Sequence, residues 1–267
     1  MTSKVHDDIR TAVRESYGKV AQQGGTGGCC SGDSSASSCC GPVPVATVAQ
    51  QLGYSADETN AVPEGANLGL GCGNPQAIAA LKPGETVLDL GSGAGFDAFL
   101  AARAVGKDGR VIGVDMTPEM LARARANALK GDYPNVEFRL GEIEHLPVAD
   151  ASVDVIISNC VINLSPDKAQ VFREAFRVLQ SGGRLAISDV VASAELPAEV
   201  RNDLALHSAC VAGASVIDEL IAALHGAGFK DVRIAPKDES REFIREWAPG
   251  RGVEDYVVSA TIEAIKP

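Results

Sequence analysis

The sequence predicts an α/β fold in which a largely parallel sheet is covered by helices on both faces. Short apolar runs alternate with helical segments from residue 86 onwards, and a glycine-rich turn follows the first run. This alternation is typical of strand–helix–strand units, and strands that are apolar throughout indicate a sheet buried on both faces. We expect strands at 86–90, 110–115, 136–141, 153–159, 184–190, 231–236 and 256–265, the last two as an antiparallel pair at the sheet edge.

Helices are predicted between these strands. A loop and a helix follow the first strand, and the helix at 118–131 has Pro118 in its first turn. The helices at 168–183 and 216–229 end in glycines, which commonly close helices. Residues 196–214 form a polar, helical stretch after the fifth strand.

The region before the sheet has a different character. Residues 4–20 place apolar side chains at helical spacing, which predicts an amphipathic helix, and its Tyr17 is a candidate either to cover a cofactor or simply to pack. Residues 21–42 are rich in Gly, Ser and Cys and nearly free of large apolar groups, so we expect a mobile segment without a core. Residues 47–82 are expected to form short helices and loops.

Composition excludes several classes of protein. The 267 residues suit one large domain, and a net charge of −11 argues against nucleic acid or an anionic membrane as a partner, because like charges repel. The N-terminus MTSKVHDDIR lacks the apolar core of a signal peptide, and no apolar run reaches the ~20 residues that span a bilayer. We therefore expect a soluble cytoplasmic protein.

The glycine-rich turn predicts a cofactor site. Gly91, Ser92, Gly93 and Gly95 follow the first strand, and Asp115 ends the second strand 20 positions after Gly95. Glycines there let the backbone approach a ligand, and a carboxylate at the next strand end can accept both ribose hydroxyls. Phe96 stands where a dinucleotide fingerprint has Gly or Ala, so we favour an adenosine-bearing cofactor without a pyrophosphate.

This region resembles the class I S-adenosylmethionine-dependent methyltransferases, whose sheet is a Rossmann-like one of seven strands. The similarity is carried by VLDLGSGAG, GVDMTPEML and GEIEHLPVADASVDVIISN, and it covers about residues 80–190. It implies that Asp89 and the Gly91–Gly95 loop contact the methionyl part of the cofactor. It also implies contacts of Asp115 and Met116 with ribose and adenine, of Glu142, Ile143 and Glu144 with adenine, and a place for Asn159 near the sulfonium.

The seven cysteines point to soft-ligand chemistry. An odd number of cysteines without a secretion signal argues against a disulfide framework. Cys72, Cys160 and Cys210 lie far apart in sequence, yet each belongs to a segment expected at the carboxyl ends of the strands. Three converging thiolates suit a trivalent arsenical, whereas zinc requires a fourth ligand. Of the four histidines, only His207, three residues before Cys210, stays open as that ligand.

With these cysteines included, the chain resembles the arsenite methyltransferase family over nearly its whole length. PEGANLGLGCGNP, IISNCVINLSPDK, ISDVV and ACVAGA carry the similarity. The resemblance implies that Cys160 and Cys210 hold arsenic, that Cys72 is the third thiol, and that Cys72 forms a disulfide with a cysteine nearer the N-terminus. The candidates for that partner are Cys29, Cys30, Cys39 and Cys40, of which Cys39 or Cys40 is favoured; Cys29 and Cys30 either bind or deliver the metalloid or are dispensable.

The implied activity is methyl transfer from S-adenosylmethionine to thiolate-bound trivalent arsenic. Arsenite would give mono- and dimethylated products, with a trimethylated one left open, and thioredoxin or glutathione would supply the thiol reductant. The expected division is an N-terminal helix and mobile segment (1–46), a cofactor-binding core (47–190), and an arsenic-binding helical region with the last strands (191–267). Two alternatives remain: a methyltransferase acting on carbon or oxygen of a small molecule, with cysteines that only pack, and a non-catalytic metalloid-binding protein.

Overall fold

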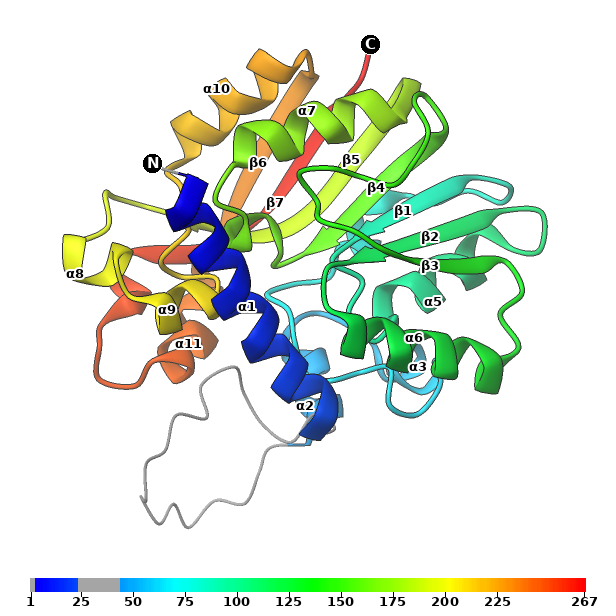
Figure 1. The fold of residues 1–267 in the computed structure, drawn as a ribbon, viewed down its shortest axis with the longest axis horizontal. Coiled ribbons are helices and arrows are strands. Elements are labelled where there is room, and N and C mark those ends of the chain that lie inside the picture. Colours follow the sequence, from blue (N-terminus) through cyan, green and yellow to red (C-terminus); the bar gives the residue numbers. More distant parts are fainter. Residues whose placement is uncertain (1–2, 24–43) are drawn as a thin grey trace.

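The computed structural model describes residues 3–23 and 44–267, and its centre is a seven-stranded sheet (Figure 1). The strand order is β3-β2-β1-β4-β5-β7-β6, and β7 runs antiparallel to both of its neighbours. This confirms the α/β class and the antiparallel pair at the edge. The strands are β1 Thr86–Leu90, β2 Arg110–Asp115, β3 Val136–Leu140, β4 Val153–Asn159, β5 Leu179–Ala192, β6 Lys230–Lys237 and β7 Val257–Ile265.

Helices cover both faces of the sheet, as the apolar strands predict (Figure 1). On one face, Phe172 and Leu224 from two helices pack with the strand residues Leu88 and Ile156 in one buried cluster. On the other face, Val87 packs with Phe99 and its neighbours in a second cluster. The first face is covered by α7 Lys168–Val178 and α10 Ile217–Ala227, and the second by α4 Gln76–Ala79, α5 Phe96–Val105 and α6 Pro118–Gly131.

The fifth strand differs from its predicted form. The helix expected at 168–183 ends at Val178, and β5 begins at Leu179 instead of residue 184. The register between β4 and β5 shifts between Val153 and Val155, and Gly182 takes a φ of +82°. The glycines therefore form an irregularity within a strand and do not close a helix. A glycine that tolerates positive φ serves either purpose, so local sequence did not distinguish them.

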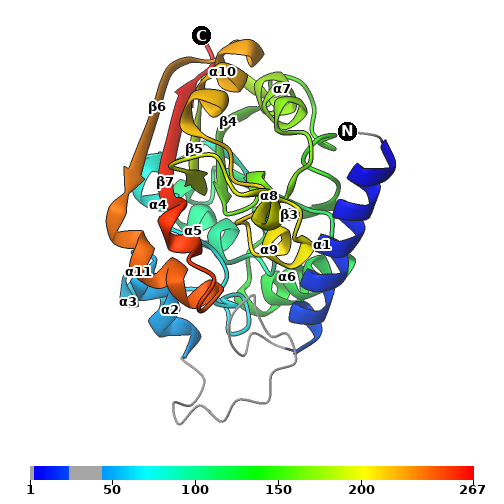
Figure 2. The ribbon, with the colours of Figure 1, turned by 90° about the vertical axis from the view of Figure 1, so that its left-hand side faces the viewer.

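Short elements gather around the carboxyl ends of the parallel strands. The N-terminal helix is longer than predicted and, in Figure 2, runs along one side of this end, with α2 and α11 along the other. Residues 47–82 form short helices and loops, as expected, whereas α11 and its flanking turns were not predicted. The remaining helices are α1 Ser3–Gln23, α2 Val45–Gln51, α3 Ala56–Asn60, α8 Ala198–Arg201, α9 Leu204–Ser208 and α11 Arg241–Ile244, with 3-10 turns at Ile162–Leu164, Asp238–Ser240, Arg245–Trp247 and Val253–Asp255.

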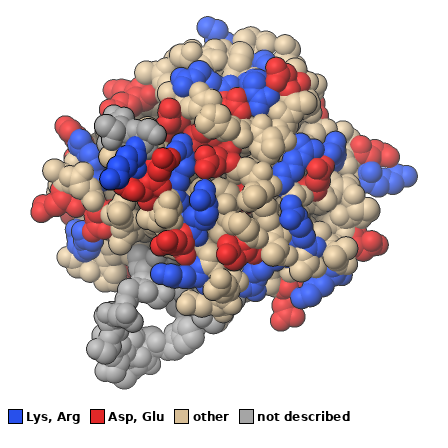
Figure 3. Space-filling view, in the orientation of Figure 1, with Lys and Arg blue, Asp and Glu red and all other residues tan. Residues whose placement is uncertain are grey.

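Charges are mixed on the face that α1 crosses. Acidic and basic side chains alternate there and do not gather by sign (Figure 3). Among the described residues, no helix is long and apolar enough to cross a membrane.

Candidate functional site

A cavity of about 880 Å³ lies at the carboxyl ends of the parallel strands. Strand register brings the ends of β1, β2 and β4 together, because Leu90 pairs with Val114 on one side and with Ser158 on the other. The glycine-rich loop, Asp115 and Asn159 follow these positions directly and line the cavity. This agrees with the rule that ligands of open α/β sheets bind beyond the carboxyl ends of the strands.

The glycine-rich loop has the backbone geometry that its sequence predicts. Gly91 and Gly95 have φ values of +66° and +97°, and a Cβ on Gly95 would come within 2.6 Å of the Phe99 ring. The Asp115 carboxylate accepts hydrogen bonds from the amides of Gly93 at 2.9 Å and Thr117 at 2.8 Å. Asp115 thus fixes the loop, and only glycine fits the turn into α5.

The cavity is rich in buried carboxyl groups. Asp89, Asp97 and Asp115 all line it. Burial, and then the nearby carboxylates of Asp97 and Asp115, raises the pKa of Asp89 well above its usual range, and burial also raises the pKa of Asp115. Asp89 Oδ2 and Ser92 Oγ are buried and have no hydrogen-bond partner among the described residues. Unpaired acceptors among carboxylates fit a ligand that carries positive charge and donates hydrogen bonds.

Most of the predicted cofactor residues meet in this cavity. Asp89, Gly91, Ser92, Gly93, Asp115, Met116, Ile143, Glu144 and Asn159 line it. Gly95 lies behind the wall as the N-cap of α5, and Glu142 pairs with arginines of α1.

The part of the cavity lined by the glycine-rich loop, Asp89 and Asp115 is called the cofactor half below. Asn159 connects this half to the loop that carries Cys72. Its Oδ1 accepts the Cys72 amide at 3.0 Å, and its Nδ2 donates to Tyr54 Oη at 2.9 Å and to Gly73 O at 2.8 Å. Nδ2 also lies 3.3 Å from Asp97 Oδ2. The amide of Asn159 is therefore fully engaged by the protein, which makes it a support for the Cys72 loop as well as a wall of the cavity.

The three described cysteines converge at the other half of the cavity. All are free thiols, and Cys72, Cys160 and Cys210 are 1%, 8% and 3% exposed. Cys210 Sγ donates to Cys160 O at 2.8 Å, and the sulfurs of Cys72 and Cys160 lie within 4.8 Å of each other and of the Asp189 carboxylate. Cys160 and Cys210 line the cavity, and Cys72 is next to Cys160 but is not among the lining residues.

Burial keeps these thiols protonated in the free protein. It raises the pKa of Cys72 to about 12 and that of Cys160 well above the usual range. For Cys210, a hydrogen bond with Cys160 and then burial raise the pKa. A ligand that binds through these sulfurs must therefore displace their protons, and those protons leave together with a group that the ligand releases.

Asp189 is a site residue that the sequence analysis did not single out. Its carboxylate accepts the amides of Ile162 at 2.8 Å and Val190 at 2.7 Å and the side chain of Asn163 at 2.8 Å. These bonds hold the turn after Cys160 against β5. An acid at the end of an apolar strand, within ISDVV, was the signal that could have identified it.

His207 does not join the thiols. Its Nε2 lies 3.2 Å from Leu164 O, and burial lowers its pKa. The potential metal-binding cluster found among the described residues consists of Cys72, Cys160 and Asp189; it contains neither a histidine nor Cys210, whose sulfur contacts the Cys160 carbonyl instead. Cys29, Cys30, Cys39 and Cys40 lie outside the described residues, as do residues 24–42 of the segment expected to be mobile, whereas residues 21–23 of that segment belong to α1.

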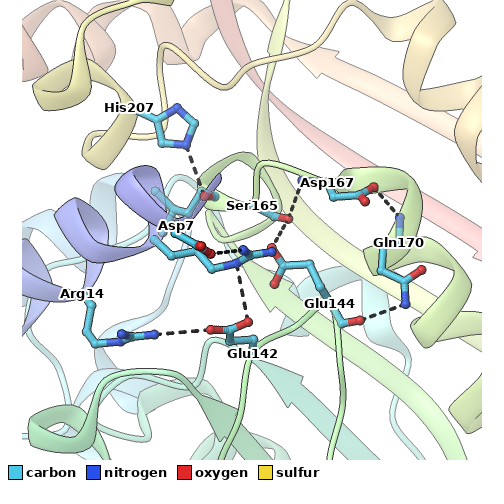
Figure 4. Close-up of polar contacts among 10 residues, drawn as sticks. Asp7, Arg14, Glu142, Glu144, Ser165, Asp167, Gln170 and His207 are labelled. Carbon is cyan, nitrogen blue, oxygen red and sulfur yellow. Dashed lines mark hydrogen bonds and ion pairs between the residues drawn. The ribbon is translucent and has the colours of Figure 1, made fainter. Parts of the chain in front are cut away.

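The N-terminal helix also reaches the cavity. Arg10, Val13 and Tyr17 line it, and Arg10 pairs with Glu142 at 3.5 Å and Glu144 at 3.3 Å. Figure 4 shows Glu142 facing Arg14 of the helix, and Glu144 beside Ser165. The arginines were not predicted, because their partners are more than 100 residues away in sequence.

Comparison with known proteins identifies the family of this chain. A family model described as a methyltransferase domain matches residues 81–245. An arsenite methyltransferase of Halobacterium salinarum is 56% identical over 98% of this chain and 67% of its own length. The chain belongs to the arsenite methyltransferase family. A second family member, from Aquipseudomonas alcaligenes, is 41% identical over 85% of this chain and 63% of its own length.

A solved structure of the family extends the agreement to the fold. The arsenic(III) S-adenosylmethionine methyltransferase of Chlamydomonas reinhardtii superposes with a TM-score of 0.63 at 36% identity, covering 85% of this chain and 74% of that one. The predicted class I methyltransferase fold is thereby confirmed. The chain spans about two thirds of the length of its microbial relatives and 42% of the human arsenite methyltransferase.

Proposed function

We propose that this protein transfers methyl groups from S-adenosylmethionine to trivalent arsenic held by Cys72, Cys160 and Cys210, and so serves arsenic detoxification. One observation carries the proposal: three buried cysteines from separate segments belong to one cluster, in which Cys160 lies next to both Cys72 and Cys210, beside a cavity whose other half fits an adenosine-bearing cation. Cys160 and Cys210 both line the cavity, whereas cysteines that served only packing would not need to reach it. The alternative of an organic acceptor is therefore disfavoured.

The residues of the cofactor half fit S-adenosylmethionine. The unpaired Asp89 Oδ2 and Ser92 Oγ offer acceptors for an ammonium group, and Asp115 offers a carboxylate for ribose hydroxyls. Bound S-adenosylmethionine supplies an electrophilic methyl group on a positively charged sulfur. Asp89, Asp97 and Asp115 favour that charge because carboxylates in a partly dry cavity attract cations strongly.

The thiols take up arsenic by exchange with its hydroxyl groups. For each As–S bond that forms, an As–O bond breaks, and the thiol proton leaves with the hydroxide as water. Three exchanges balance three thiols against arsenous acid, so the raised pKa of Cys72 does not prevent binding. Soft thiolates prefer arsenic to harder cations, and the three sulfurs leave its lone pair free to accept the methyl group. The protein's part is to hold arsenic in place and exclude water.

Methylation raises arsenic formally to the pentavalent state, so two electrons must return to it. The thiol of Cys39 or Cys40 can provide them by attacking the arsenic-bound Cys72 sulfur: the attacking thiol loses its proton, a disulfide with Cys72 forms, and the As–S bond to Cys72 breaks with its electron pair left on arsenic, which becomes trivalent again. A dithiol such as thioredoxin, or glutathione, would then reopen that bond by exchange. Three free buried thiols fit a reducing compartment, which supports the expected cytoplasmic location.

Arsenic speciation tests the proposal. Purified protein is incubated with arsenite, S-adenosylmethionine and thiol, beside Cys160→Ser, and products are separated by chromatography with elemental detection. We expect methylated arsenic from the wild type and at least a 100-fold loss in the variant, because a hydroxyl is a hard, weak ligand for arsenic. Binding of S-adenosylhomocysteine should stay within about twofold.

Full activity of Cys160→Ser would refute the assignment of its thiol. Absence of methylated arsenic from the wild type, with cofactor binding intact, would refute the substrate. Omitting the added thiol from the same assay tests the reductant, because turnover should then stall.

A further inference from the structure

Helix α1 packs against both halves of the cavity. Its Tyr17 contacts a buried cluster on the cofactor side, which includes Ala94 and Met120, and also the cluster that contains the three cysteines. Val13, one turn earlier, is buried in the second cluster. Figures 1 and 2 show α1 running beside α9 and α6, the two elements that flank these halves. A ligand in either half therefore lies next to this helix.

Charged contacts fasten the helix in this position. Glu144, which is 3% exposed, pairs with Arg10 at 3.3 Å and accepts Ser165 Oγ at 2.6 Å, and Arg14 pairs with Glu142 at 3.3 Å. Figure 4 shows the two glutamates below the helix. Removing the partner of a buried carboxylate costs several kcal/mol. The pair of Glu144 with Arg10 therefore holds α1 in place as part of the cavity wall.

The hydroxyl of Tyr17 reaches the segment that presents Cys210. It donates to Ser208 O at 3.4 Å, at the end of α9 and two residues before Cys210. Tyr17 and Cys210 pack in the same cluster, and the nearby hydroxyl opposes the upward shift of the pKa of the Cys210 thiol. Cys210 has a φ of +62°, a backbone conformation that few residues other than glycine adopt, and this conformation sets the direction of its side chain.

Arsenic binding changes the hydrogen bonding of the Cys210 sulfur. In the free protein, this thiol donates its proton to Cys160 O. When the sulfur bonds to arsenic, that proton leaves as part of water, and the sulfur becomes only an acceptor with increased negative charge. A donor already beside it then gains strength, because hydrogen bonds to charged acceptors are stronger than neutral ones.

We propose that Tyr17 is a positioning residue of the arsenical site, whose hydroxyl donates to the Cys210 sulfur once that sulfur holds arsenic. The inference rests on the proposed function and adds the N-terminal helix to the arsenic-binding half. Tyr17 does not touch the arsenic; it acts through Cys210.

The test compares Tyr17→Phe with wild type in the full-length chain. Cys29, Cys30, Cys39 and Cys40 are changed to Ser in both, so that bound arsenic reports only the buried thiols. Equilibrium dialysis measures the Kd for arsenite and, separately, for S-adenosylhomocysteine. Tyr133→Phe is the matched control, because it removes a half-buried hydroxyl that donates to Ala61 O at 3.2 Å, away from the cysteines.

We expect Tyr17→Phe to raise the Kd for arsenite about five- to tenfold, as loss of one hydrogen bond predicts. The Kd for S-adenosylhomocysteine should change less than about twofold, and Tyr133→Phe should alter neither. An unchanged arsenite Kd, or an equal loss for both ligands, would overturn the inference, since the latter means that the hydroxyl only packs the helix. A wild type that binds no arsenite would instead overturn the proposed function, and this inference with it.

Discussion

Cys160 and Cys210 both occupy the left-handed backbone region, with φ values of +59° and +62°. A residue with a side chain pays of order 1–3 kcal/mol to stay there, and such strain concentrates at functional sites. The Cys160 amide donates to Ser188 O at 2.8 Å, and Asp189 fixes the next turn through the Ile162 amide. Glycine would relieve the strain but lose the thiol, so the strain supports a role for the sulfur.

At this scale, the sequence singled out the cysteines and Asp115 as candidates but not the residues that hold them in place. A cysteine after a strand end and an acid at the next strand end are local signals. The link between Cys160 and Asp189 depends on the pairing of Asn159 with Ser188 across two strands, and that register is not contained in either segment alone. The same reason explains why the bond from Asn159 to the Cys72 amide was not predicted.

The buried carboxyl groups predict a falling stability in mildly acidic to neutral solution. Burial raises the pKa of Asp97 to about 6, whereas the unfolded chain has a pKa of about 3.9. The folded state therefore retains a proton that the unfolded chain has released. The free energy of unfolding should fall as pH rises from about 5 to 7 by roughly half of the about 3 kcal/mol that a two-unit shift contributes, because the other half is lost below pH 5. Urea unfolding at a series of pH values measures this.

Two variants separate this effect from the rest of the molecule. Asp97→Asn should flatten the fall between pH 5 and 7. Glu137→Gln should leave it unchanged, because hydrogen bonds from Arg139 and Arg110 lower the pKa of Glu137 to about 2 and its contribution is lost only in stronger acid. A stability that rises across this window, or a slope that Asp97→Asn does not alter, would contradict the assignment.

Among the elements, agreement with the sequence depends on how local the determining signal is. Helix α6 begins at Pro118 as predicted, and α10 ends before Gly228, whose φ of +108° suits a C-terminal glycine. The predicted start of β5 was wrong, because Gly182 and Gly183 fit the end of a helix and an irregularity within a strand equally well. Helix α11 was not predicted, since four residues give no periodic pattern.

Helix α10 contains a glycine whose replacement by alanine should stabilise the protein. Gly226 lies inside the helix, and a Cβ there would meet nothing within 4 Å. Gly226→Ala should therefore stabilise the protein by about 0.5–1 kcal/mol through helix propensity alone, as measured by urea unfolding. Gly228→Ala should destabilise it, because its positive φ is unfavourable and Phe176 lies 2.9 Å from the added Cβ. Equal effects of the two changes would show that the end of α10 is placed wrongly.

Across the whole molecule, one cavity joins segments from both ends of the chain. Helix α1, the Gly-rich loop, the strand ends and the stretch around α9 all line it, so the site forms only when the complete fold has assembled. Composition predicted an acidic protein, and the fold places part of that acidity, in Asp89, Asp97 and Asp115, inside the cavity. Which acids turn inward depends on tertiary packing and could not be read from net charge.

The central claim is that three thiolates from distant segments hold one arsenic atom. X-ray absorption at the arsenic edge measures its neighbours directly, in the full-length chain with Cys29, Cys30, Cys39 and Cys40 changed to Ser and one equivalent of arsenite bound. Three sulfur neighbours and no oxygen are predicted. Changing Cys72, Cys160 or Cys210 to Ser should remove one sulfur in each case. Oxygen neighbours in the parent protein, or a sulfur count that one of these changes leaves untouched, would contradict the account.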